Sequence, residues 1–248
     1  MRGYELRPMS VGEILDGSVS IYRECFATLV TIAIVCLGIP TLMQVYVALS
    51  GNTFSFMDFF ALLLWSFGSF VSSAATLWVV SETYLGRSAT ASEALRFAFG
   101  KIGALFITGL GVGLIVMLGL LLLIVPGVIA ACGYAVTSQV VVLENVSGDI
   151  AMKRSWHLTK GFKGKVFGLG CVAFLIVLLP SIALGMVAAL LPGGEGTATA
   201  LGDFVALAVT PLFTSAFTLL YYDLRVRKEA FDLEMLTQQL GGSQPAAT

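Results

Sequence analysis

Positions 102–143 of the sequence read IGALFITGLGVGLIVMLGLLLLIVPGVIAACGYAVTSQVVVL, without a single Asp, Glu, Lys or Arg. As one helix, these roughly 42 residues would extend about 63 Å, about twice the ~30 Å hydrocarbon core of a bilayer. Proline is favoured at the start of a helix and glycine permits a tight turn, so we expect a hairpin at Val125-Pro126-Gly127. The stretch therefore predicts two membrane-spanning helices, at 102–125 and 127–143.

The rest of the chain repeats this apolar character. Hydrophobic residues make up 57% of the 248 residues and charged residues only 12%, whereas soluble domains carry about 25% charged residues. A chain of this composition could not cover its surface in water, so we expect an all-α, polytopic membrane bundle. Four further apolar segments complete six predicted transmembrane helices, and they lie at 26–49, 57–81, 166–191 and 204–222.

The basic residues give this bundle an orientation. All 14 Lys and Arg residues lie in 1–25, 82–101, 144–165 and 223–248. The loops on the other side, at 50–56 and 192–203, have none. Since basic loops stay in the cytoplasm, we expect a multi-pass protein of the bacterial cytoplasmic (inner) membrane with both termini cytoplasmic.

The cytoplasmic segments themselves have helical patterns. Ser10 with Glu13, and Thr90 with Glu93, have the spacing of a capping box at the start of a helix. We expect amphipathic interfacial helices, followed by a disordered tail at 241–248. The helices are expected at 10–24, 90–100, 147–160 and 223–240. Each of the first three precedes two predicted membrane helices, which suggests a threefold internal repeat within a single domain, 1–240.

Two stretches resemble a known family. They are RSWHLTKG, which starts at Arg154, and LYYDLRVRKE, which starts at Leu220. LRPMSVGEIL from Leu6 and YLGR from Tyr84 are similar too. The chain resembles a bacterial family of uncharacterised six-helix proteins related to the membrane domain of glycerophosphoryl diester phosphodiesterases. The resemblance implies a membrane fold and no established activity, because nothing here supplies the metal ligands of their catalytic domain.

The sequence offers little for catalysis. The only histidine, His157, lies on an interfacial helix between Trp156 and Leu158, where contact with lipid headgroups explains it better than metal binding. No zinc, phosphate-loop, nucleophile-elbow or dinucleotide motif is present. We therefore expect no enzyme activity, metal or cofactor. The net charge of −1 gives no reason to expect a nucleic-acid partner.

Two hypotheses concern the charged residues at the cytoplasmic ends of the predicted membrane helices. A basic set either serves as topology signal or binds anionic lipid headgroups, and it consists of Lys153, Arg154, Lys160, Lys163 and Lys165. The acids are expected to pair with nearby bases such as Arg87, Arg154 or Arg225. This ion-pair set consists of Glu82, Glu144, Asp223 and Arg225.

Small and polar residues inside the membrane segments leave two functions open. The GxxxG spacings at Gly109/Gly113 and Gly164/Gly168 indicate helix packing. Serines of the second span form either another packing face or, with Gln139, Thr210 and Thr214, a polar path. The relevant hydroxyl residues of that span are Ser66, Ser69, Ser73 and Thr76.

The first function is organisation of lipid or partner proteins at the cytoplasmic face. The alternative is a channel or transporter for a neutral or amphiphilic small molecule. The apolar stripe of 223–240 either contacts a partner or second copy, or docks back on the chain.

Overall fold

The structure is a computed structural model that describes residues 8–50, 56–188 and 194–229. Its elements are all α-helices, as predicted. The predicted tail at 241–248 and positions 230–240 of the last amphipathic helix lie outside the described residues. The helices are α1 (Val11–Glu24), α2 (Phe26–Ser50), α3 (Phe56–Tyr84), α4 (Ala91–Phe99), α5 (Ile102–Leu122), α6 (Ile124–Gly133), α7 (Thr137–Leu143), α8 (Gly148–Thr159), α9 (Lys163–Ala188) and α10 (Gly194–Glu229).

Five helical segments of the described chain are long and apolar enough to cross a membrane, so the chain has the make-up of a multi-pass membrane protein. They match five predicted spans and comprise Phe26–Val47, Phe59–Tyr84, Ile102–Leu122, Ile124–Leu143 and Lys163–Ala188. The predicted sixth span, 204–222, lies within α10, which continues without a break to Glu229. A total of six spans stays a prediction.

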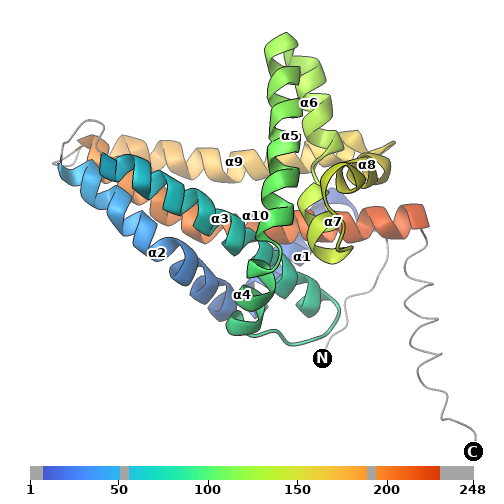
Figure 1. The fold of residues 1–248 in the computed structure, drawn as a ribbon, viewed down its shortest axis with the longest axis horizontal. Coiled ribbons are helices and arrows are strands. Elements are labelled where there is room, and N and C mark those ends of the chain that lie inside the picture. The colour runs from blue at the N-terminus through green and yellow to red at the C-terminus, as the bar shows by residue number, and fades with distance from the viewer. Residues whose placement is uncertain (1–7, 51–55, 189–193, 230–248) are drawn as a thin grey trace, which may run out of the picture.

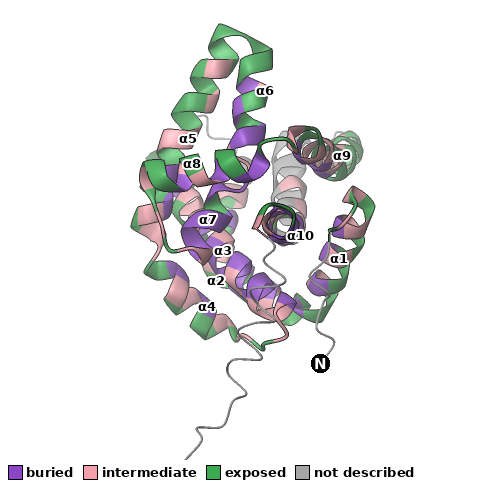
Figure 2. Cartoon of the chain, turned by 90° about the vertical axis from the view of Figure 1, so that its right-hand side faces the viewer, coloured by how far each residue is buried: buried purple, intermediate pink, exposed green. Residues whose placement is uncertain are grey.

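The long helices form two arms that diverge from a common hub (Figure 1). The first arm consists of α2, α3, α9 and the N-terminal part of α10; α10 contacts each of the other three helices, and α2 contacts α3. The second arm is the hairpin of α5 and α6, which points in a different direction. The hub consists of α1, α4, α7, α8 and the C-terminal part of α10. Figure 2 shows buried residues gathered in the hub, whereas most of the second arm is exposed.

The second arm turns at Leu123 and not at the predicted Val125-Pro126-Gly127. Leu123 is extended (φ −164°, ψ 144°) and separates α5 from α6. Pro126 lies in the first turn of α6, where its missing N–H costs no helical hydrogen bond. Below the turn, a Cβ added to Gly119 would lie 2.9 Å from the Cα of Gly127. The two helices of the hairpin therefore touch backbone to backbone, which only glycine permits here.

Among the described residues, three of the four glycines with the predicted GxxxG spacings have no close helix neighbour. A Cβ added to Gly113, Gly164 or Gly168 would meet nothing within 4 Å. At Gly109 it would meet the Phe70 ring at an ordinary 3.6 Å. Helix packing at Gly113, Gly164 and Gly168 stays a prediction, because glycine spacing places two residues on one helix face but does not say whether a helix or lipid covers that face.

The predicted capping boxes are confirmed. The Ser10 and Glu13 side chains bond each other's backbone N–H at the start of α1, and Thr90 and Glu93 do the same at the start of α4. The apolar sides of these helices and of α8 are buried in the hub, where Ile14 and Leu158 are fully covered. Short helices therefore join the arms through protein contacts. Their position at a membrane surface and the threefold repeat stay predictions.

Candidate functional site

The hub contains a network of charged side chains around Arg154 of α8. Its Nε donates to Glu144 Oε2 at 2.8 Å, and its Nη2 donates to Glu229 Oε2 at 2.8 Å. Glu229, at the end of α10, also accepts from Arg225 Nε at 3.1 Å. The Tyr221 hydroxyl donates to Glu144 Oε1 at 2.9 Å. Two of the predicted ion-pair residues, Glu144 and Arg225, thus belong to one network that docks α10 on α8.

Within this network, the charged forms of Glu229 and Arg154 are favoured. Burial opposes the ionised form of Glu229, but hydrogen bonds and charge from Arg154 and Arg225 outweigh it and lower the pKa of Glu229. The hydrogen bond to Glu229 is the largest influence on Arg154 and raises its pKa, although burial acts in the opposite direction. Arg154 and Glu229 therefore pair as charged groups at neutral pH.

A second group of charges surrounds Asp223, which is fully buried. Its carboxylate accepts from the Met9 backbone N–H at 2.6 Å, from Lys165 Nζ at 2.5 Å, and from Arg227 Nε at 3.1 Å. The sequence suggested Arg225 as a nearby base for this acid. The partner on the same helix is instead Arg227, because residues four apart share a helix face whereas residues two apart do not. Asp223 thus ties the N-terminal segment to α9 and α10.

The remaining predicted ion-pair residue, Glu82, lies at the end of α3. Arg87 approaches it with 3.6 Å between Nη1 and Oε2, and the Arg87 side chain is 65% exposed. An exposed pair of this kind contributes about 0–1 kcal/mol. Glu82 therefore adds little to the hub compared with Glu144 and Asp223.

The five residues of the predicted headgroup set have different environments. Arg154 and Lys165 are held in the two charge groups of the hub. Lys153 forms an exposed ion pair with Asp149 on the same helix, at 3.0 Å. Lys163 Nζ lies 3.5 Å from the centroid of the Trp156 ring, and Lys160 is exposed. Three of the five, Lys153, Lys160 and Lys163, therefore remain available to a headgroup, and their lipid binding stays a prediction.

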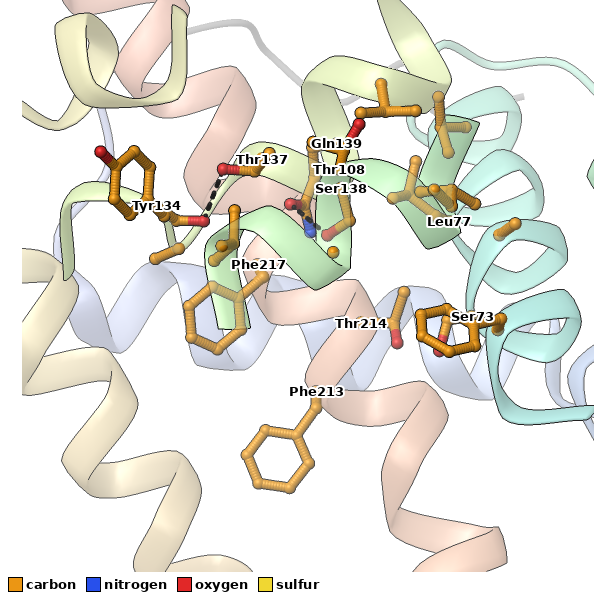
Figure 3. Close-up of a pocket in the computed structure, with 18 of the residues that line it drawn as sticks. Ser73, Leu77, Thr108, Tyr134, Thr137, Ser138, Gln139, Phe213, Thr214 and Phe217 are labelled. Carbon is orange, nitrogen blue, oxygen red and sulfur yellow. Dashed lines mark hydrogen bonds between the residues drawn. The ribbon is translucent and has the colours of Figure 1, made fainter. Parts of the chain in front are cut away.

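A pocket of about 540 Å³ lies where the two arms meet, between α3, α5, α7 and α10 (Figure 3). Its wall is largely apolar and aromatic, and contains no charged side chain among the residues that the structure describes. Three residues of the polar path considered from the sequence, Ser73, Gln139 and Thr214, meet in it. The lining consists of Phe70, Ser73, Ala74, Leu77, Leu105, Thr108, Gly109, Val112, Ala131, Tyr134, Ala135, Thr137, Ser138, Gln139, Val141, Val142, Phe213, Thr214 and Phe217.

Several hydroxyl groups of this wall are already bonded to the backbone. Thr137 donates to the Tyr134 carbonyl at 2.8 Å, and Thr214 donates to the Thr210 carbonyl at 3.2 Å. Outside the pocket, Ser66 and Ser69 also donate to carbonyls of their own helix. Three of the six hydroxyl groups that suggested a polar path, those of Ser66, Ser69 and Thr214, therefore satisfy helix carbonyls, as membrane serines and threonines commonly do.

The chemistry of the described residues gives no metal or nucleophilic centre to build on. No group of three or more His, Cys, Asp or Glu side chains that could hold a metal ion occurs in the part of the chain that the structure describes. Comparisons with family models, curated proteins and solved structures yield no match for this chain. The resemblance to the six-helix family stays a prediction, and the function has to be argued from the pocket and the arms.

Sequence reasoning missed parts of the site. Arg227 could have been identified from its i,i+4 spacing to Asp223, because residues four apart lie on the same helix face. No sequence pattern identifies the wall residues Phe70 and Phe217. An aromatic residue in an apolar helix fits the sequence equally well whether it faces lipid, the protein core or a pocket.

Proposed function

We propose that this protein is a non-enzymatic membrane protein that organises lipids at the cytoplasmic face of the bacterial inner membrane. The observation that carries the proposal is the divergence of the two apolar arms from a charged hub (Figure 1). Helices that diverge in a bilayer leave between them a space that protein does not fill. Lipid has to occupy that space, because water there would leave apolar side chains hydrated.

The exposed side chains support this reading. Large apolar residues cover the second arm, and Leu122 near its tip is 79% exposed. The hub, by contrast, buries its charges in ion pairs and leaves Lys153, Lys160 and Lys163 for contact with headgroups. Acyl chains would contact the arms while anionic headgroups would contact the lysines, each contributing about 1 kcal/mol.

Lipid retention in mild detergent tests the proposal. Native mass spectrometry of the purified chain should show bound lipid, enriched in anionic species over their share of the membrane. Replacing Lys153, Lys160 and Lys163 together by Gln should reduce this enrichment by about fivefold per lysine. Arg23→Gln on α1 is the matched control. Lipid retention no greater than that of an unrelated membrane protein would refute the proposal.

The pocket favours the alternative of a transporter for a neutral or amphiphilic small molecule. Its volume is within the range of about 300–1,000 Å³ that ligand sites occupy. Its largely apolar wall suits a lipid better than a polar solute. A flux assay in proteoliposomes separates the two: lipid organisation predicts no flux above empty liposomes, and saturable flux of a neutral amphiphile would replace the proposal by the transporter.

A further inference from the structure

The pocket at the junction of the arms contains a buried polar side chain that faces it (Figure 3). Gln139 of α7 is 3% exposed. The Ser138 hydroxyl donates to Gln139 Oε1 at 3.1 Å, so the amide oxygen has a partner. The other end of the amide is the NH2 group, which donates hydrogen bonds. Among the described residues, no hydrogen bond is found for this NH2 group. A buried donor without an acceptor is unfavourable, so its position indicates a ligand that brings an acceptor.

The surroundings define the chemistry of that ligand. The described lining of the pocket contains no charged side chain, so the part of the ligand inside it is neutral and largely apolar. A second hollow of about 370 Å³ shares Tyr134 with the pocket and is lined also by Asp149, Met152, Lys153 and Trp156. The two hollows together thus offer an apolar site next to one that is lined by the Lys153–Asp149 ion pair and an aromatic ring.

We propose that the pocket binds one acyl chain of a membrane glycerolipid, with Gln139 donating to the ester carbonyl and the headgroup lying in the hollow beside Lys153 and Trp156. This inference rests on the proposed function. An ester carbonyl is a neutral group that only accepts hydrogen bonds, as the Gln139 NH2 requires. The pocket contacts α5 between Leu105 and Val112, near its start at the hub. On the predicted topology this is the cytoplasmic leaflet, where inner-leaflet ester groups lie.

Lipids with ester or ether linkages test the role of Gln139. Native mass spectrometry of the full chain in detergent should show tighter binding of a diester phosphatidylglycerol than of its diether analogue with the same chains. We expect a three- to tenfold difference, the range of one hydrogen bond. Gln139→Leu should abolish this preference, and Gln44→Leu, on α2, should keep it. An equal preference in wild type and Gln139→Leu would overturn the assignment.

Filling the pocket gives a test that does not depend on Gln139. Gly109 lines the pocket, so Gly109→Leu should reduce the tightly bound lipid at least tenfold. Gly113→Leu, on the same helix where a side chain meets open space, should leave it unchanged. Equal lipid retention by both variants would place the lipid elsewhere on the arms and overturn the pocket, while the proposed function stands. Absence of retained lipid from the wild type would overturn both.

Discussion

Asp223 shows how a single buried charge is stabilised in this protein. Its carboxylate has lost all contact with solvent and is compensated by Lys165, Arg227 and the Met9 N–H. Removing one partner of a buried ion pair leaves the other charges uncompensated. We therefore expect Asp223→Asn to lower the free energy of unfolding by about 3 kcal/mol. A lower yield of monodisperse protein in detergent and a lower melting temperature would be the measured effects.

The control for this substitution is Asp149→Asn on α8. Asp149 also pairs with a lysine, but both side chains are at least 75% exposed, so its loss should change stability by less than about 1 kcal/mol. Equal melting temperatures for Asp223→Asn and the wild type would show that the hub does not depend on this pairing.

Glu229 makes the hub sensitive to acid. Its pKa is lower in the folded chain than in the unfolded chain, so the unfolded state takes up the proton at a higher pH. The stabilisation is complete above the unfolded-state pKa of about 4.3 and is lost as the pH falls through the lower folded-state pKa. We expect Glu229→Gln to melt at a lower temperature than wild type at pH 7, with a difference that shrinks below about pH 4.

Thermal melts between pH 3 and pH 7 measure this effect. Glu24→Gln, on the exposed side of α1, should follow the wild-type curve over the whole range. If the difference in melting temperature between Glu229→Gln and wild type stays constant down to pH 3, the role assigned to the Arg154–Glu229 pair is contradicted.

At the scale of elements, the second arm depends on the close approach of α5 and α6. A Cβ on Gly127 would lie 2.6 Å from the Leu120 backbone nitrogen, which cannot move without moving α5. We expect Gly127→Val to destabilise the chain by about 1–3 kcal/mol, the usual cost of overpacking. Gly113→Val, where the added side chain meets open space, should be close to neutral. Comparable melting temperatures for the two variants would contradict the close hairpin.

Structural features were predictable from the sequence where they depend on interactions between residues close together in the chain. The capping boxes at Ser10 and Thr90 follow from a spacing of three residues. Pairs such as Lys165–Asp223 join residues far apart in sequence, and no local pattern specifies them. The turn at Leu123 was missed for a related reason, since proline is as compatible with the first turn of a helix as with the turn before it.

At the scale of the whole molecule, hydropathy indicates which segments prefer lipid but not how these helices pack or how they are oriented relative to one another. The sequence predicted the long helices and placed Ser73, Gln139 and Thr214 in one hypothetical path, and all three line the pocket. It did not predict two diverging arms. A lipid-facing surface places few demands on sequence beyond apolarity, so the angle between the arms depends on the packing in the hub, which only the tertiary structure reveals.

The topology of the second arm is the most direct test of the whole arrangement. The 21 residues of α5 extend about 31 Å, enough to cross the hydrocarbon core once. If α5 starts on the cytoplasmic side, the turn at Leu123 emerges on the opposite side. A membrane-impermeant maleimide should therefore label Leu123→Cys in intact cells and Lys160→Cys only after permeabilisation, with the wild-type chain as background for its four native cysteines. Labelling of both positions only after permeabilisation would make α5 and α6 a re-entrant hairpin, and the protein would not cross the membrane there.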